Sequence, residues 1–370
     1  MNQITDTNLL NIDKELVSIV EKVISNTRID KNEGLALLEK ADLGLLGYLA
    51  SIVNERINGK NVYFNKNIHI EPTNQCIYHC KFCSYYRKKG EEGWEYSVPE
   101  MLEMVRNLEQ DVKEVHVVGG VHPKWDVHFF GNLFKQMKEI RPDLHIKAFT
   151  AVEISHICKK AHLSVREGLL ALKEYGMDSI PGGGAEIFDE EIRQQVCPHK
   201  DTADEWLFIH KTAHEIGMKS NATILYGHIE KPIHRIDHLD RLRKLQDETG
   251  GFNVFIPLKF KNKNNELSYL PETSIVDDLK MYAISRIYLD NFNHIKAYWP
   301  MMGKDVAQLS LSFGVDDLDG TINDTTKIYS LAGAEEQTPS MTTIDMVNLI
   351  KMVGKNPVER DSIYNIIKNY

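Results

Sequence analysis

Three cysteines at short, uneven spacing are the residues of this chain best suited to metal chemistry. Cys76, Cys80 and Cys83 lie in the run EPTNQCIYHCKFCSYYR and form the pattern C-x3-C-x2-C. Cysteine thiolates hold iron–sulfur clusters, and a cubane 4Fe-4S cluster has four irons to ligate. Cys158 and Cys197 lie far along the chain in unrelated sequence, so neither completes a local set of four thiolates. The pattern therefore predicts a 4Fe-4S cluster with one open iron.

An open iron can chelate the amino and carboxylate groups of S-adenosylmethionine (SAM), and this cysteine spacing is typical of radical SAM enzymes. Phe82, just before the last cysteine, either packs beside the adenine of SAM or fills the core. A zinc site is the main alternative, but structural zinc prefers four closed ligands in paired C-x2-C knuckles. The triad fits a cluster better than it fits zinc.

The composition argues against several classes of protein. The 370 residues carry a formal net charge of -9 with no basic run of five or more residues, so a nucleic-acid partner is not expected. The longest apolar stretch, Leu43–Val53, is shorter than the ~20 residues that a membrane-spanning helix needs. The first residues, MNQITDTNLLNIDKEL, have neither the basic nor the apolar region of a signal peptide. We expect a cytoplasmic protein without a membrane partner, and its cysteine usage suits a reducing compartment.

The hydrophobic period changes near residue 61. Residues 1–60 show helical spacing, whereas β-rich apolar runs alternate with amphipathic helices farther on. The expected strands are Ile68–Pro72, Glu114–Gly119, His145–Val152, Ser179–Pro181, Ser220–Tyr226, Val254–Leu258, Ile295–Trp299 and Leu309–Phe313. Such alternation implies a parallel sheet, and this number of units implies a (β/α)8 TIM-type barrel in the α/β class. We predict a helical extension at 1–60, a radical SAM barrel at 61–335 and carboxy-terminal helices packed on it at 336–370.

Chemistry in such a barrel gathers at the carboxyl ends of the strands. Gly119 and Gly120 follow the second expected strand and can let the backbone approach SAM closely. Many radical SAM enzymes use Gly-Gly-Glu here to grip the methionyl amine, but Val121 replaces that acid. His122 comes next, either as a contact to substrate or cofactor or as an ordinary turn residue before Pro123.

The third and fourth strand ends add candidate SAM ligands. Glu153 could bind a ribose hydroxyl or an amine of SAM, or it could be a surface acid at the start of a helix, where the dipole favours it. Gly183 lies in the glycine run at 181–186, whose amides could cradle a carboxylate, a ribose or an adenine edge.

The fifth expected strand alternates polar and apolar residues. Strand geometry places Asn221, Thr223 and Leu225 on one face, and we expect this face to line the lumen, with Asn221 near the cofactor. His228 follows Gly227 at the rim of the barrel. With His122 it is our candidate for catalysis through contact with the substrate.

Basic residues farther along could bind substrate carboxylates. Arg235, Lys259 and Lys296 lie near strand ends or loops, although each also fits a solvated charge. The acidic run GVDDLDGT, residues 314–321, follows the last expected strand, and we interpret it as a solvated turn rather than a metal site.

Similarity to one family extends from about residue 40 to residue 365. It is carried by the blocks EPTNQCIYHCKFCSYYR, VGGVHP, KAFTAVEI, PGGGAEIFDEEIR, SNATILYGHIE, HIKAYWPMMG and GVDDLDGT. These blocks resemble the aminofutalosine synthases, radical SAM enzymes of the futalosine route to menaquinone. The GGVHP, KAFTAVEI and GGGAEIF blocks look like the synthase rather than the dehypoxanthine futalosine cyclase of the same route.

The resemblance implies a transferase that consumes SAM as a co-substrate. The 5'-deoxyadenosyl radical is expected to add to the enol-ether double bond of 3-[(1-carboxyvinyl)oxy]benzoate, giving 6-amino-6-deoxyfutalosine, methionine and bicarbonate or carbon dioxide. It also implies an electron donor such as flavodoxin or ferredoxin. The alternatives are the cyclase, a deazaflavin synthase-like radical SAM enzyme, and a non-catalytic iron-sulfur or zinc protein. Product analysis separates the enzymes, and iron content separates the last class.

Overall fold

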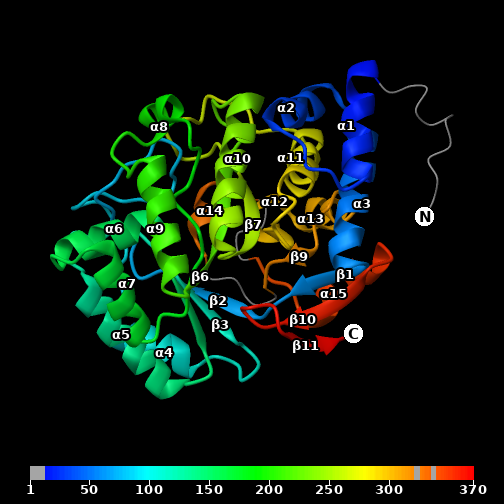
Figure 1. Cartoon of the computed structure of the whole chain (residues 1–370). Helices are drawn as coiled ribbons and strands as arrows, with labels where there is room; N and C mark the ends of the chain where they lie inside the picture. Colours follow the sequence, from blue (N-terminus) through cyan, green and yellow to red (C-terminus); the bar gives the residue numbers. More distant parts are fainter. Residues whose placement is uncertain (1–12, 321–325, 335–338) are drawn as a thin grey trace.

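Three helices begin the described part of the chain. A computed structural model describes residues 13–320, 326–334 and 339–370, so most of the amino-terminal run MNQITDTNLLNIDKEL lies outside it (Figure 1). The helices are α1 (Lys14–Ile24), α2 (Lys31–Lys40) and α3 (Leu43–Asn58). Asp13, Asp30 and Asp42 each accept a hydrogen bond from a backbone N–H of the following first turn, which satisfies donors that a helix leaves unpaired.

The described strands form one curled sheet. They are β1 (Asn61–Phe64), β2 (Asn67–Ile70), β3 (Glu114–Val117), β4 (His145–Ala148), β5 (Ser179–Ile180), β6 (Lys219–Tyr226), β7 (Phe252–Lys259), β8 (His294–Ala297), β9 (Asp317–Leu318), β10 (Asn356–Arg360) and β11 (Ile366–Asn369). Their order in the sheet is β11-β10-β1-β9-β8-β7-β6-β5-β4-β3-β2. Neighbouring strands run parallel except for the β10–β11 pair.

The curl brings the two ends of the parallel run β2–β9 together. β1 pairs with β9 and β2 pairs with β3, yet only Asn65 and Lys66 separate β1 from β2 along the chain. The predicted α/β fold is therefore confirmed as a curled, mostly parallel sheet with helices around it (Figure 1).

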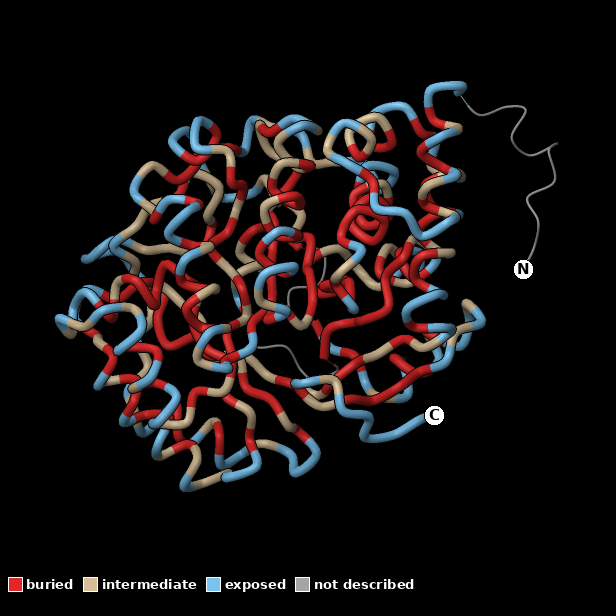
Figure 2. The backbone as a smooth tube through the Cα atoms, viewed as in Figure 1, coloured by how far each residue is buried: buried red, intermediate tan, exposed pale blue. Residues whose placement is uncertain are grey.

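Helices surround the curled sheet, and most of them bury apolar side chains in the interior (Figure 1). They are α4 (Val98–Arg106), α5 (Val127–Ile140), α6 (Ala151–Lys160), α7 (Val165–Glu174), α8 (Glu190–Val196), α9 (Ala203–Glu215), α10 (Pro232–Thr249), α11 (Ile275–Tyr288), α12 (Trp299–Met302), α13 (Lys304–Ser310), α14 (Ile328–Leu331) and α15 (Thr343–Met352). Figure 2 shows buried residues along the strands and on the inner faces of these helices. Burial of apolar surface, at about 25 cal/mol per Å², is the main force that holds these layers together.

The expected strand Leu309–Phe313 is wrong. Leu309 and Ser310 end α13 and residues 311–313 form a turn, with Ala307, Ser310 and Leu311 buried and Leu309 exposed. The strand that follows β8 is instead β9, which comes from the acidic run that we expected to be a solvated turn. Asp317 fits inside the sheet because Arg360 pairs with its carboxylate at 2.6 Å.

The last segment also differs from the sequence-based expectation of helices over 336–370. Only α15 is helical there among the described residues, and β10 then pairs in parallel with β1. β10 buries Val358, Glu359 and Arg360, which gives the segment a partner in the sheet rather than on a helix surface.

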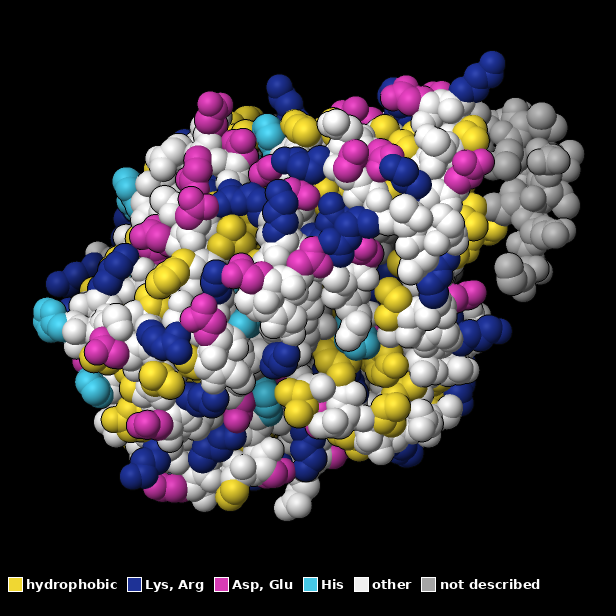
Figure 3. Space-filling view, viewed as in Figure 1, with side chains coloured by type: hydrophobic (Ala, Val, Ile, Leu, Met, Phe, Trp, Pro, Cys, Tyr) yellow, Lys and Arg dark blue, Asp and Glu magenta, His cyan; other side chains and the backbone are white. Residues whose placement is uncertain are grey.

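The surface carries charges of both signs. Figure 3 shows Lys and Arg side chains intermixed with Asp and Glu on the face that it draws. Within the described residues, no helix is long and apolar enough to cross a membrane.

Candidate active site

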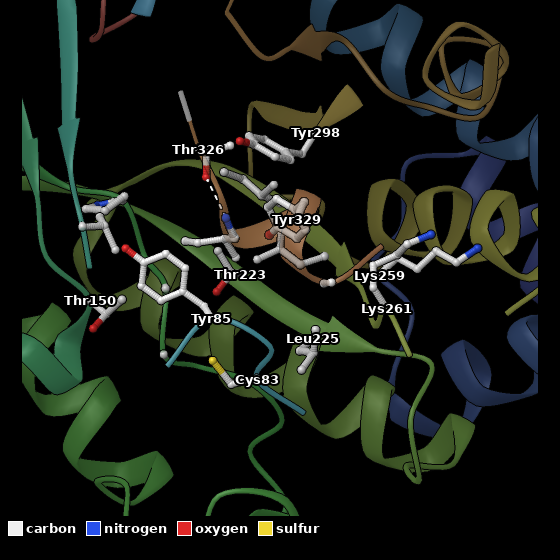
Figure 4. Close-up of a pocket in the computed structure, with 18 of the residues that line it drawn as sticks. Cys83, Tyr85, Thr150, Thr223, Leu225, Lys259, Lys261, Tyr298, Thr326 and Tyr329 are labelled. Atoms are coloured by element: carbon white, nitrogen blue, oxygen red, sulfur yellow. Dashed lines mark hydrogen bonds between the residues drawn. The ribbon is translucent and has the colours of Figure 1, made fainter. Parts of the chain in front are cut away.

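A cavity of ≈ 280 Å³ opens at the carboxyl ends of the parallel strands (Figure 4). Its walls combine the cysteine loop, the strand ends and the segment around α14, and are lined by His69, Phe82, Cys83, Ser84, Tyr85, His116, Val118, Thr150, Pro181, Gly183, Gly184, Glu186, Asn221, Thr223, Leu225, Ile256, Leu258, Lys259, Phe260, Lys261, Tyr298, Asp319, Thr326, Ile328, Tyr329 and Ala332. The lining is largely apolar with a few polar groups, which is the usual character of a small-molecule site.

The cysteine loop is held by backbone pairing to itself. The N–H of Cys76 donates to the carbonyl of Arg87 at 3.0 Å, and the N–H of Arg87 donates to the carbonyl of Asn74 at 2.7 Å. The N–H of Cys83 donates to the carbonyl of Cys80 at 3.0 Å, which folds the second half of the triad into a tight turn. Cys83, the last cysteine of the triad, lines the cavity.

The triad fits an iron–sulfur cluster by its chemistry. The N–H of Val121 donates to Sγ of Cys76 at 3.4 Å, the kind of hydrogen bond that tunes a cluster sulfur. Burial raises the pKa of all three thiols, so metal binding must displace their protons. No three His, Cys, Asp or Glu side chains in the described residues are placed to hold a single metal ion. A cubane differs from such an ion, because each thiolate binds a different iron.

A second segment braces the cysteine loop from outside. The N–H of Lys81 donates to the carbonyl of Val196 at 2.9 Å, and the rings of His79 and His199 lie 4.9 Å apart. Cys80 and Cys197 share one apolar cluster, so the fold brings Cys197 close to the triad although it lies far along the chain. The sequence gives no sign of this contact, because the elements from α4 to α8 separate the two segments along the chain.

Cys158 is remote from the triad, as expected. A Cβ on Gly168 would lie 2.2 Å from the sulfur of Cys158, which places this cysteine in the contact between α6 and α7.

Gly119 and Gly120 do not line the cavity; they support the cysteine loop. A Cβ on Gly119 would lie 2.8 Å from the carbonyl oxygen of Thr73, and one on Gly120 would lie 2.3 Å from that of Gln75. The N–H of Gly120 donates to the carbonyl of Thr73 at 2.7 Å. The two glycines allow the loop after β3 to touch the start of the cysteine loop, so their proposed contact with SAM stays a prediction.

Glu153 is buried at the start of α6. Its carboxylate accepts hydrogen bonds from the N–H groups of Thr150 at 2.7 Å and Gly119 at 3.2 Å. Burial raises its pKa to about 7, although these hydrogen bonds oppose the rise. Glu153 is not among the described residues that line the cavity, and its role as a SAM ligand remains a prediction.

Phe82, Gly183 and Asn221 do line the cavity, as their assignment to the cofactor site requires. Asn221, Thr223 and Leu225 face it together, which confirms the face of β6 that we chose from alternation. The glycine run is needed for packing as well, because a Cβ on Gly183 would lie 2.8 Å from the side chain of Thr150.

His122 and His228 are buried outside the described lining of the cavity. The imidazole of His122 lies 3.2 Å from the carboxylate of Glu95 and packs against Trp125, with ring centroids 4.1 Å apart. The Nε2 of His228 donates to the carbonyl of Leu225 at 3.1 Å. His228 therefore braces a residue that lines the cavity, whereas a direct contact of either histidine with substrate is untested.

The three basic candidates are all paired. Arg235 binds the carboxylate of Glu230 at 2.7 Å, and Lys259 binds that of Asp278 at 2.8 Å. Lys296 is buried 3.1 Å from the carboxylate of Asp319. Of the three, Lys259 borders the cavity, and Lys261 joins it there.

Sequence reasoning missed a histidine pair in the cavity. His69 on β2 and His116 on β3 are register partners, and their rings meet edge to face at 4.7 Å. Glu114 lies 2.5 Å from Nε2 of His116 and 2.7 Å from Nζ of Lys147. Burial lowers the pKa of His116 to about 4, so the ring is neutral. One signal was available: NIHI and EVHV put a histidine at the same place in successive strands.

Family models match two consecutive parts of the chain. Residues 70–242 match the Radical SAM superfamily, and residues 249–369 match the CofH/MqnC C-terminal region. An aminodeoxyfutalosine synthase of Thermus thermophilus is 44% identical over 96% of this chain and 97% of that protein. The chain belongs to the radical SAM superfamily. The predicted class of enzyme is therefore confirmed, and so is the resemblance to the synthases.

Other members of the superfamily are less similar. A 5-amino-6-(D-ribitylamino)uracil–L-tyrosine 4-hydroxyphenyl transferase of Archaeoglobus fulgidus is 38% identical over 86% of this chain and 92% of its own. A cyclic dehypoxanthine futalosine synthase of Streptomyces coelicolor is 33% identical over 95% of this chain and 88% of its own. The crystal structure of methylornithine synthase matches with a TM-score of 0.74 at 18% identity, covering 92% of this chain and 97% of that one, which supports the fold alone.

Proposed function

We propose that this protein is an aminodeoxyfutalosine synthase, which joins the adenosyl carbon of SAM to 3-[(1-carboxyvinyl)oxy]benzoate. The products are 6-amino-6-deoxyfutalosine, methionine and bicarbonate or carbon dioxide, in menaquinone biosynthesis. The observation that carries the proposal is the 44% identity with the Thermus synthase along nearly the whole of both chains. A cavity with aromatic walls beside the cysteine loop supports it, because the substrate is an aryl enol ether.

Cys76, Cys80 and Cys83 are proposed to bind a 4Fe-4S cluster whose fourth iron takes SAM. The three thiols share one loop, and none of them is in a disulfide. When bound, the reduced cluster supplies the electron that splits SAM into methionine and a 5'-deoxyadenosyl radical. Gly183 and Asn221 lie along the cavity that Cys83 enters, and we propose that they contact the nucleoside part of SAM.

The cavity walls are proposed to contain the radical. A primary carbon radical reacts with almost any C–H bond, so the alkene must lie close to it and water must stay out. Reaction usually requires the two atoms to lie about 3–3.5 Å apart with aligned orbitals. Tyr298 and Tyr329, whose rings are 5.1 Å apart, lie across the cavity from Cys83 and Leu225 (Figure 4). This aromatic side is where we propose that the arene packs.

Lys259 and Lys261 are the cationic residues in the described lining, and we propose that they attract the substrate carboxylates. Each already has a carboxylate partner, Asp278 and Glu272, at 2.8 Å and 2.7 Å. A substrate carboxylate would share each ammonium group with the carboxylate already paired to it. Because each ammonium group is already partly removed from water, binding the substrate costs less desolvation of the lysine.

The experiment follows the adenosyl carbon. Reconstituted enzyme is incubated with the substrate, a chemical reductant and SAM labelled at C5'. A synthase moves the label into a nucleoside larger than 5'-deoxyadenosine and releases methionine in equal amount. Stoichiometric labelled 5'-deoxyadenosine would overturn the proposal and indicate a hydrogen-abstracting enzyme such as the cyclase. A substrate with a saturated side chain is the control, since it keeps the arene and both carboxylates but lacks the acceptor.

The electron donor is proposed to be a small one-electron protein, a flavodoxin or a ferredoxin. This proposal rests on the resemblance to the synthases. Replacing the chemical reductant by either purified donor in the same assay tests it, and failure of both would contradict it.

A further inference from the structure

A buried ion pair connects the cavity wall to the cysteine loop. Nζ of Lys200 lies 2.5 Å from the carboxylate of Glu186, and their side chains are only 15% and 12% exposed. Glu186 lines the cavity after β5, whereas Lys200 follows α8. The sequence does not predict this ion pair, because fourteen positions separate the two residues.

The ammonium group of Lys200 lies beside the cysteine loop. It lies 5.3 Å from the ring centroid of Phe82, the residue between Lys81 and Cys83. The segment that carries it is fixed to the same loop by the bond from the N–H of Lys81 to the carbonyl of Val196. Cys80, Phe82 and Cys83 pack in one apolar cluster with Cys197, which lies three residues before Lys200.

The backbone of Glu186 is fixed in an unusual conformation. Its backbone has φ = 49°, in the left-handed region that residues other than glycine rarely adopt. Its carbonyl accepts a hydrogen bond from the N–H of Leu225 at 2.8 Å, which fixes this conformation to β6. Strained backbone of this kind persists where the surroundings impose it, and it often marks a functional side chain.

A fixed charge of either sign changes how readily a nearby cluster accepts an electron. Reduction adds one negative charge, so a neighbouring cation favours the reduced state and a neighbouring anion opposes it. Net charge is among the factors that set cluster potentials, and buried charges are screened much less than exposed ones.

We propose that Lys200 and Glu186 together set the reduction potential of the cluster held by Cys76, Cys80 and Cys83. This inference rests on the proposed cluster of the synthase. Lys200 stabilises the reduced cluster, and Glu186 orients its ammonium group while limiting its effect. They are positioning residues that act on the cluster through its electrostatic environment.

The test is a potentiometric titration of the reconstituted enzyme without SAM, followed by electron paramagnetic resonance. Lys200→Met should lower the ratio of reduced to oxidised cluster at fixed potential by at least tenfold, which is about 59 mV for a one-electron couple. Glu186→Gln should raise that ratio, and Lys200→Arg should keep it near the wild-type value. Lys211→Met is the matched control, because it removes a lysine from an exposed pair with Glu248.

Opposite shifts in Lys200→Met and Glu186→Gln would support the proposal, since a merely structural role predicts no such sign change. Unchanged potentials, or shifts of the same sign, would overturn it. Loss of SAM binding by Lys200→Met at unchanged potential would also overturn it and assign Lys200 to the SAM carboxylate. Wild-type protein that takes up no 4Fe-4S cluster would instead refute the proposed function. If Lys200→Met does not fold, Glu186→Gln and Lys200→Arg still decide the outcome.

Discussion

The carboxylate of Glu153 accepts a hydrogen bond from the backbone N–H of Gly119 at 3.2 Å. This bond ties the start of α6 to the loop after β3. The same loop holds the cysteine loop, because the N–H of Gly120 donates to the carbonyl of Thr73 at 2.7 Å. Glu153 is thus connected through Gly119 and Gly120 to the cysteine loop, and its charge state bears on how firmly the loops are joined.

Replacement of Glu153 by Gln should change how stability depends on pH. Burial raises the pKa of Glu153 from 4.5 to about 7, so the folded protein binds this proton more tightly than the unfolded chain. Its contribution to stability is therefore full below about pH 4.5 and is lost as the pH rises through 7. The shift of the pKa from 4.5 to about 7 corresponds to about 3 kcal/mol of unfolding free energy, at ~1.4 kcal/mol per pKa unit. The stability of wild type relative to Glu153→Gln should fall as the pH rises from 5 to 8.

Thermal unfolding of the two apo proteins measures this difference. With an unfolding entropy of about 2.1 cal/mol/K per residue, the expected change in the Tm difference is about 4 °C. Glu205→Gln is the matched control, because Glu205 also caps a helix, α9, but its hydrogen bond with Thr202 lowers its pKa. Its Tm difference should stay constant above pH 5. If the Tm of wild type minus the Tm of Glu153→Gln stays constant or rises between pH 5 and pH 8, the raised pKa of Glu153 is contradicted.

Replacement of Cys76, Cys80 or Cys83 by Ala should abolish cluster loading, whereas Cys158→Ala should leave it intact. Cys197→Ala should also keep the cluster, although a gap beside Cys80 in their shared apolar cluster costs about 1 kcal/mol. Iron and acid-labile sulfide per chain are the measurements. Loss of iron from Cys197→Ala at a normal Tm would make Cys197 a ligand and would contradict the assignment of the triad.

The sequence predicted most of the sheet because each parallel strand is a short apolar run between helices. β9 escaped that pattern, since its two residues, Asp317 and Leu318, include an acid that strands rarely contain. Arg360 neutralises this acid from β10, and no local pattern predicts a partner so far along the chain. The spacing of apolar residues also led to the wrong prediction of a strand at Leu309–Phe313, where α13 ends.

Sequence reasoning predicted the site residues that follow from local spacing along the chain. It missed the pairs that form only because the fold brings distant segments together. The cysteine triad is a local pattern, and the alternation of β6 correctly placed Asn221 and Thr223 in the cavity. The His69–His116 pair and the Lys200–Glu186 pair depend on which strands and loops become neighbours. His122 follows a strand end as sequence reasoning required, yet its ring turns toward Glu95 rather than the cavity.

Gly120→Ala should displace the cysteine loop and lower cluster loading. The new Cβ would lie 2.3 Å from the carbonyl oxygen of Gln75 and 3.0 Å from the carbonyl carbon of Asn74, and backbone atoms cannot move away cheaply. Overpacking of this kind typically costs 1–3 kcal/mol, about the size of several loop hydrogen bonds. Iron content after reconstitution, compared at equal protein concentration, measures the effect.

Gly44→Ala is the control for this substitution. Its Cβ would meet the side chain of Asp42 at 3.2 Å and no backbone atom outside its own helix within 4 Å, and alanine suits the helix α3. If Gly120→Ala and Gly44→Ala both have normal iron content, the cluster does not require the close approach of the loop after β3 to the cysteine loop.

His228→Phe should raise the fraction of SAM that is cleaved unproductively to 5'-deoxyadenosine. The imidazole donates to the carbonyl of Leu225 at 3.1 Å, and Leu225 lines the cavity, so loss of this bond loosens the end of β6. A misplacement of 1 Å can cost about a hundredfold in rate. We expect a severalfold rise in the ratio of 5'-deoxyadenosine to adenosylated product, with unchanged iron content.

The ratio of the two nucleosides, measured by chromatography under limiting reductant, separates this role from general destabilisation. Exposed His128→Phe on α5 is the control and should leave the ratio at the wild-type value. His122→Gln enters the same assay, because a raised ratio there would support its predicted contact with substrate. If His228→Phe lowers total turnover but leaves the ratio unchanged, the bond to Leu225 does not position the substrate relative to the radical, and the brace on β6 serves stability alone.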